Sequence, residues 1–239
     1  YPLEKYGISI VNVGSTAFLR YSGIMQRKDE SSIGIPVSVI TDCDVRPYDV
    51  DQETKEKKLD EKKDESIKQE KEKNKNYTEG SVRGFTSPRW TLEYCIAMSC
   101  LSEDFHKSVH YGKKIFNAKE YISLTNEKIV EADNEAAKEM EKWSDMPLWK
   151  RAYEIYSLML DENGKSSLKA IVAQCLASVL RWKISEIPDE FKQEKMFDLD
   201  LYGLKINNQQ KDKLKAELEQ DQFLGYIVKA IKYAAGETV

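Results

Sequence analysis

Residues 36–49 read PVSVITDCDVRPYD, an apolar run that ends abruptly at two aspartates, Asp42 and Asp44. The run from Pro36 to Thr41 is rich in Val and Ile, which predicts a buried strand. In open α/β sheets, ligands bind beyond the carboxyl ends of the strands, where these two acids lie. Two carboxylates held close together repel each other unless a cation neutralises them. The stretch therefore predicts a divalent-metal site, with Mg²⁺ or Mn²⁺ favoured by the hard oxygen ligands.

Other runs of the same kind place this strand in a parallel sheet. ISIVNV (8–13) predicts a strand, followed by a glycine turn and an amphipathic helix over residues 16–27. The order strand, helix, strand predicts a βαβ unit whose sheet is covered on both faces. SVRGFTSPRW (81–90) predicts a further short strand. TLEYCIAMSCL (91–101) then opens a helix, with Thr91 as its N-cap.

The second half of the chain is predicted to be helical, without a confident strand after about residue 110. Ser166 is expected to cap the clearest of its helices. The helices are predicted over residues 126–142, 168–180 and 223–235. The fold class is therefore α/β, with a parallel sheet flanked by helices in residues 1–107 and a helical region in residues 108–239.

Residues 51–76 are almost wholly charged, with acids and bases in balance. Such composition is typical of a solvated helix or a partly disordered excursion. An arm that contacts DNA is the alternative, although the acids in this segment offset its lysines.

Composition excludes several classes of protein. The 239 residues carry a net charge of −4, so any DNA contact would come from a local patch. The four cysteines form no CxxC pair and predict reduced thiols in a cytoplasmic protein. His106 and His110 are not spaced to build a zinc site with these cysteines. No stretch reads as a membrane span or signal peptide, and the missing initiator Met suggests a fragment or a processed chain.

The strand–turn–helix GISIVNVGSTAF (7–18), followed by a strand that ends in DCD, resembles the Toprim fold of topoisomerases, primases and several nucleases. Three later segments are similar, in order, to the carboxy-terminal region of the overcoming-lysogenization-defect (OLD) family of ATP-dependent endonucleases. Gabija phage-defence nucleases belong to that wider group. These segments are TLEY (91–94), KAIVAQCLA (169–177) and FLGYIVKAIKYA (223–234).

The resemblance implies roles for individual residues. Asp42 and Asp44 match the acidic pair that binds Mg²⁺ or Mn²⁺, and Glu93 matches the acid of the second metal. Lys169 matches the lysine near the scissile phosphate, with Lys165 as its competitor at the helix start. The implied reaction is two-metal hydrolysis of a DNA phosphodiester, in which the lysine stabilises the transition state.

The predicted partners follow from the same resemblance. Arg46, Arg83 and Arg89 could steer DNA phosphates, or they are solvated surface arginines. The full-length protein is expected to carry an ATPase domain and to form a homo-oligomer. Neither a GxxxxGK[ST] loop nor the EGxxE-like motif of OLD nucleases occurs here, so the fragment could be inactive by itself.

Two alternatives stay open at this point. A Toprim of topoisomerase or primase type would need a nucleophilic tyrosine in another domain or a zinc ribbon. A non-catalytic assembly or DNA-binding module would need neither, and it is favoured by the missing glutamate motif.

Overall fold

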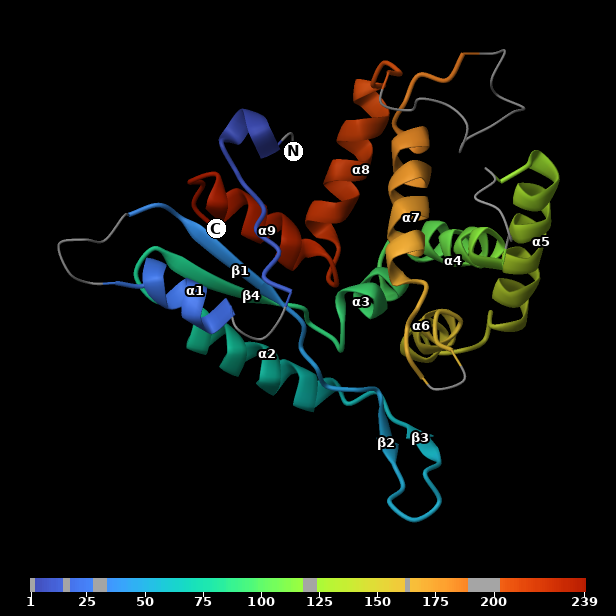
Figure 1. Ribbon diagram of the computed structural model, residues 1–239, viewed down its shortest axis with the longest axis horizontal. Coiled ribbons are helices and arrows are strands. Elements are labelled where there is room, and N and C mark those ends of the chain that lie inside the picture. The colour runs from blue at the N-terminus through green and yellow to red at the C-terminus, as the bar shows by residue number, and fades with distance from the viewer. Residues whose placement is uncertain (1–2, 15–17, 28–33, 118–123, 162–163, 189–202) are drawn as a thin grey trace. The chain divides into compact units, whose positions relative to one another are not determined.

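The computed structural model describes residues 3–14, 18–27, 34–117, 124–161, 164–188 and 203–239 (Figure 1). Its elements, in chain order, are η1 (Leu3–Tyr6), α1 (Phe18–Met25), β1 (Val37–Thr41), β2 (Tyr48–Val50), β3 (Lys57–Leu59), α2 (Lys63–Tyr77), β4 (Val82–Thr86), α3 (Leu92–Met98), α4 (Ser102–Asn117), α5 (Asn126–Lys142), α6 (Leu148–Ser157), α7 (Lys169–Lys183), α8 (Asn208–Gln220) and α9 (Gly225–Ala234).

The chain forms two compact units. The first contains residues 1–95 together with 221–239, and the second contains residues 96–220. Helix α9 therefore belongs to the unit that contains the sheet. The predicted boundary between an α/β domain and a helical domain at residue 107 stays a prediction.

Strands β1 and β4 form a parallel pair in the first unit, in register from Val37 opposite Val82 to Thr41 opposite Thr86. These are the strands predicted within residues 35–41 and 81–90. The sheet is small and flanked by helices, so the α/β class and the parallel arrangement are confirmed.

Helix α9 covers one face of this sheet. The ring of Phe85 lies 6.1 Å from that of Tyr233, measured between centroids. The hydroxyl of Ser38 donates to the carbonyl of Ala230 at 2.6 Å, and the hydroxyl of Tyr233 donates to the carbonyl of Ser81 at 3.0 Å. Hydrogen bonds thus tie α9 to β1 and to the residue just before β4.

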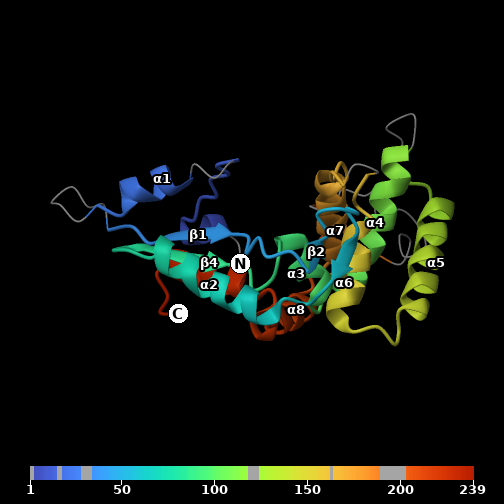
Figure 2. The same ribbon diagram turned by 90° about the horizontal axis from the view of Figure 1, so that it is seen from below.

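Helix α2 covers the opposite face, because successive residues of a strand point to opposite sides. Gly84, next to Phe85, lies so close to α2 that an added Cβ would stand 2.9 Å from Cβ of Tyr77. Figure 2 shows α2 running beside β4. The glycine therefore permits the close approach of helix and strand.

The same helix also satisfies the outer edge of β4. The side-chain oxygen of Asn74 accepts a hydrogen bond from the backbone N–H of Thr86 at 2.7 Å. The hydroxyl oxygen of Thr78 accepts one from the N–H of Gly84 at 3.1 Å. An edge strand leaves such groups unpaired unless something covers them. The charged segment is thus in part a helix, as predicted, but one packed on the sheet.

The rest of the charged segment precedes that helix as a hairpin. Strands β2 and β3 pair antiparallel, with Tyr48 opposite Leu59. Lys62, just before α2, forms an ion pair with Asp49 at 2.8 Å. This hairpin was not predicted, because its strands have only three residues each, too few for a periodic pattern to stand out.

The strand predicted over ISIVNV (8–13) is wrong. Residues 8–14 have no regular secondary structure, and the side chains of Ile10 and Val11 are 79% and 76% exposed. A β-branched run becomes a strand only where a neighbouring edge pairs with its backbone groups. Within the described ranges, β1 pairs with β4 alone. The predicted βαβ unit is therefore wrong as well.

The second unit consists of helices around an apolar core. The predictions of helices over 126–142 and 168–180 are confirmed by α5 and α7. Tyr111 of α4, Ala132 of α5 and Cys175 of α7 lie in one buried cluster. The predicted cap by Ser166 is wrong, because α7 begins after Leu168 without a side-chain cap. No helix in the described ranges has the length and apolar character needed to cross a bilayer.

Replacing Gly84 by alanine tests the contact between α2 and β4. The added Cβ would also stand 3.0 Å from the carbonyl oxygen of Asn74, which is backbone and cannot move alone. Because overpacking of this kind destabilises, we expect Gly84→Ala to lower the free energy of unfolding by about 1–3 kcal/mol in urea titrations.

Gly23→Ala is the matched control. Gly23 lies within α1 and has no atom within 4 Å of an added Cβ. Alanine there should be neutral or stabilising by up to about 1 kcal/mol, since glycine weakens a helix. An unchanged stability in Gly84→Ala would contradict the close approach.

Candidate metal centre

The pairing of β1 with β4 continues as hydrogen bonds beyond the ends of both strands. The carbonyl of Thr41 accepts from the N–H of Ser87, and the hydroxyl of Ser87 accepts from the N–H of Cys43 at 2.8 Å. The N–H of Asp44 donates to the carbonyl of Trp90 at 2.9 Å. The loop that carries both aspartates is therefore fixed to the segment that leads into α3.

Asp42 and Glu93 lie close together at this end of the sheet. A carboxylate oxygen of Asp42 accepts a hydrogen bond from the N–H of Leu92 at 2.9 Å, and Glu93 is the next residue. Glu93 is half-buried in the first turn of α3, and Thr91 caps that turn through the N–H of Tyr94, as predicted. The strand end thus brings two of the three predicted acids to one place.

Tyr226 of α9 is near enough to these acids for their charges to act on its hydroxyl, and the sequence did not indicate it. Burial raises the pKa of its hydroxyl, and the acidic groups of Cys95, Asp42 and Glu93 raise it further. Tyr226 therefore stays protonated at neutral pH and can donate a hydrogen bond in the acidic region.

Asp44 points elsewhere, because its backbone has φ 68°, a left-handed conformation that Asp tolerates better than most residues. Its side chain is 71% exposed and accepts a hydrogen bond from Lys73 of α2 at 2.5 Å. The same ammonium donates to the backbone carbonyl of Asp42 at 2.8 Å. Lys73, also missed from sequence, thus supplies a cation between the two aspartates.

Asp44 also lines an open groove of about 370 Å³ next to the hairpin. Its polar walls come from both the hairpin and α2. They include Arg46, Asp49, Lys62, Glu65 and Gln69.

The three acids do not converge on one point. Among the described residues, Asp42, Asp44 and Glu93 are not close enough together to share one ion. A group of three side chains that is close enough lies in the second unit. The carboxylates of Asp42, Asp44 and Glu93 still offer the hard oxygen donors that Mg²⁺ and Mn²⁺ prefer. The donor chemistry therefore fits a divalent ion, and the ligand roles stay a prediction.

Lys169 and Lys165 belong to the second unit. Lys169 is the first residue of α7, and its ammonium lies 5.5 Å from the centre of the Tyr156 ring. Lys165 is exposed before the helix begins. A partnership of either lysine with the acids of the first unit stays a prediction.

The three predicted DNA-binding arginines have different surroundings. Arg89 is only 9% exposed and donates to the carbonyl of Pro88, so its guanidinium does not face solvent as a phosphate contact would require. Arg83 is exposed, and its Cζ atom lies 4.6 Å from the centre of the Tyr233 ring. It pairs with Ser38 near the start of the strands, whereas the acids follow the strand ends. Arg46 is exposed beside the acids and best suits the predicted role.

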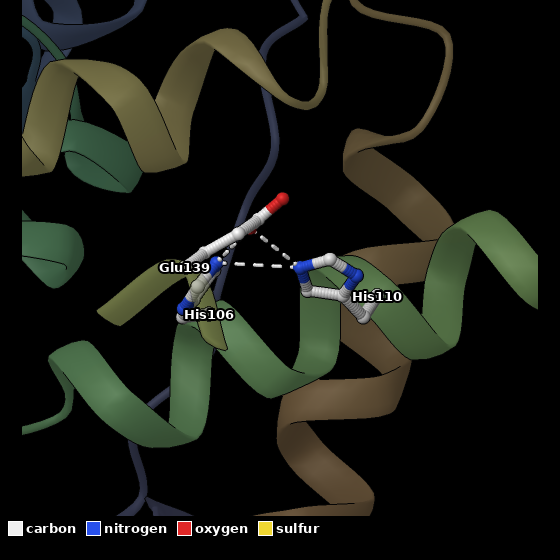
Figure 3. Close-up of side chains that lie close together, drawn as sticks. All are labelled: His106, His110 and Glu139. Atoms are coloured by element: carbon white, nitrogen blue, oxygen red, sulfur yellow. Dashed lines mark hydrogen bonds and ion pairs between the residues drawn. The ribbon is translucent and has the colours of Figure 1, made fainter. Parts of the chain in front are cut away.

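The second unit contains a histidine–glutamate cluster that was not predicted, because the sequence was searched for zinc sites made of histidines and cysteines only. The Nε2 atoms of His106 and His110 lie 2.8 and 2.9 Å from Oε2 of Glu139 (Figure 3). The histidines are four residues apart on α4, which puts both rings on one face. That spacing was the available signal; Glu139 comes from α5.

Burial affects the protonation of this cluster. It lowers the pKa of His106 to about 4, although the hydrogen bond to Glu139 acts in the opposite direction. Nδ1 of His106 is buried without a hydrogen-bond partner in the described part of the chain. Burial raises the pKa of Glu139, but hydrogen bonds from His110 and His106 outweigh it and hold the pKa below its ordinary value. His106 is therefore neutral and Glu139 ionised at pH 7.

Comparison with protein families gives a match at the start of the chain. Residues 1–44 match the family model described as overcoming lysogenization defect protein-like, TOPRIM domain. The match ends on Asp44 and supports a nuclease-type Toprim module of the OLD-like family. No curated protein and no solved structure matches the chain.

The hydrogen bond from Leu92 to Asp42 predicts a difference between two substitutions. Asp42→Ala removes the acceptor of a helix-terminal N–H and should lower the free energy of unfolding by about 1 kcal/mol. Asp42→Asn keeps an acceptor oxygen and should unfold within about 0.5 kcal/mol of the parent chain. Urea titrations measure both, and equal destabilisation by the two variants would contradict the capping role.

Proposed function

We propose that the chain is the nuclease module of an OLD-like endonuclease, which hydrolyses DNA phosphodiester bonds with divalent metal ions. The observation that carries the proposal is the link from Asp42 to the N–H of Leu92. This hydrogen bond connects the loop of Asp42 and Asp44, which ends the segment matched by the family model, to the start of α3. Glu93, the third predicted acid, lies there, beyond the matched residues.

The proposed roles follow the local chemistry. Asp42 and Glu93, both half-buried, would hold Mg²⁺ or Mn²⁺, with Asp44 as a further ligand from the same loop. The metal would supply an activated water and charge stabilisation. The Tyr226 hydroxyl could donate to an oxygen bound there, and Lys169 would offset negative charge on the reacting phosphate. Arg46 would contact the DNA backbone.

A non-catalytic Toprim module is the second candidate, and Lys73 is the observation that favours it. Its ammonium, 16% exposed as a side chain, already neutralises the aspartate loop. A built-in cation of this kind would stabilise the loop without a metal ion. For catalysis, Lys73 would have to give way to the ion.

A plasmid-nicking assay separates the two candidates. With Mn²⁺ or Mg²⁺, the chain should convert supercoiled plasmid to nicked or linear products. Asp42→Asn and Glu93→Gln should each lower the rate about 100-fold or more, because each removes a charge that holds the metal. Asp42→Asn is chosen because it keeps the acceptor for Leu92.

Asp49→Asn is the control for a nearby acid, since Asp49 lines the groove but lies within β2 of the hairpin. It should leave the rate unchanged. The assay is repeated with the chain extended by any residues that precede Tyr1 in its gene. Metal binding without cleavage in both versions would overturn the nuclease proposal in favour of the non-catalytic module.

Removing the Lys73 ammonium tests whether it competes with the metal. We expect Lys73→Met to raise the affinity for Mg²⁺ about threefold, because an ion pair whose carboxylate is as exposed as that of Asp44 contributes at most about 1 kcal/mol. Calorimetric titration measures this, with Glu139→Gln present in both proteins so that the histidine cluster does not contribute. A weaker affinity in Lys73→Met would instead make the lysine a support of the site.

A further inference from the structure

We infer that His106, His110 and Glu139 form a binding site for one Zn²⁺ ion in the second unit. This site is separate from the predicted acids at 42, 44 and 93, and it does not depend on the proposed nuclease activity. Both imidazoles present Nε2 to the same carboxylate oxygen, and the two Nε2 atoms lie 3.3 Å apart (Figure 3).

The three ligand atoms have the spacing that a bound zinc ion requires. Tetrahedral ligands at about 2.0–2.1 Å from zinc are about 3.3 Å from one another. Here the sides of the triangle are 2.8, 2.9 and 3.3 Å. A circle through the three atoms has a radius of about 1.75 Å, so an ion just outside their plane would reach all three at bonding distance. Small side-chain adjustments would open the two shorter sides.

The side chains of Glu135 and Lys114 orient the His110 ring, in the way that neighbouring carboxylates commonly orient histidines that bind metals. Nδ1 of His110 lies 3.2 Å from a carboxylate oxygen of Glu135. Glu135 is held by Lys114 at 2.8 Å, and Lys114 also pairs with Glu131 at 3.1 Å. When zinc displaces the proton that Nε2 shares with Glu139, the carboxylate of Glu135 can hold the remaining ring proton on Nδ1, which leaves the Nε2 lone pair for the ion.

The surroundings suit a transition metal better than Mg²⁺. Both histidine side chains are buried, and the ring of His106 lies 5.2 Å from that of Trp143. Two imidazoles and one carboxylate are a donor set that zinc binds readily, whereas Mg²⁺ prefers oxygen ligands alone. Three protein ligands leave one position of a tetrahedral ion open to water or another ligand.

Bound zinc would connect two helices. His106 and His110 belong to α4, and Glu139 belongs to α5. Within this pair, the ion would replace shared hydrogen bonds by bonds from one metal to both helices. Because binding to the folded chain stabilises it, the thermal stability of the second unit should depend on zinc.

Metal analysis of the whole chain tests the inference. After chelator treatment and dialysis against micromolar Zn²⁺, the chain should retain one zinc per molecule by mass spectrometry. Replacement with Co²⁺ should give the intense visible bands of a tetrahedral site. Glu139→Gln should lower the zinc affinity by about tenfold or more, because it removes the charged ligand and keeps its shape.

Glu141→Gln is the matched control, because Glu141 is an exposed acid of the same helix outside the cluster. It should bind zinc like the parent chain. Circular dichroism of the metal-free variants checks folding, and His110→Gln provides a second ligand variant. A parent chain without stoichiometric zinc, or equal affinities in Glu139→Gln and Glu141→Gln, would overturn the inference.

Discussion

The first unit depends on the parallel pairing of β1 with β4 and on its continuation into the loops. Ser87 and Trp90 accept hydrogen bonds from the N–H groups of Cys43 and Asp44, so the loop after β1 cannot move independently of the segment after β4. The carboxylate of Asp42 then meets the N–H of Leu92. Without this pairing, nothing would bring the loop that carries Asp42 to the start of α3, because the two segments lie about 50 positions apart in the chain.

Helix α2 shows how a nearly apolar-free segment can belong to a folded core. Its inner face carries small and polar residues, with Ser66 buried and Asn74 bonded to the edge of β4. Here an exposed strand edge, rather than apolar area, selects the partner, because unpaired backbone groups are costly once covered. The same face carries Lys73 to the aspartate loop.

Part of the candidate site could be predicted, because Asp42 and Asp44 directly follow the apolar strand in the sequence. A Val/Ile strand that runs into Asp-Cys-Asp indicates acids at a sheet edge. The buried Cys43 between them lies beyond β1 and contacts Ser87 and Ser66. Lys73 and Tyr226 were not predictable, because they reach the acids from elements that are distant in the chain. Glu139 was missed for the same reason: the spacing of His106 and His110 indicates a shared helix face but not the residue opposite it.

By itself, the sequence determined the elements that local chemistry decides. The capping residue Thr91 located the start of α3, composition located α5, and helical periodicity located α7 and α9, each to within a few residues. The apolar run located β1. Only the tertiary structure decided that ISIVNV pairs with none of the described strands, that α2 packs on the sheet, and that two histidines meet a glutamate from another helix. The physical reason is that periodicity and capping act between residues one turn or one strand apart. The pairing of strand edges and the gathering of charges depend instead on which distant segments the fold brings together.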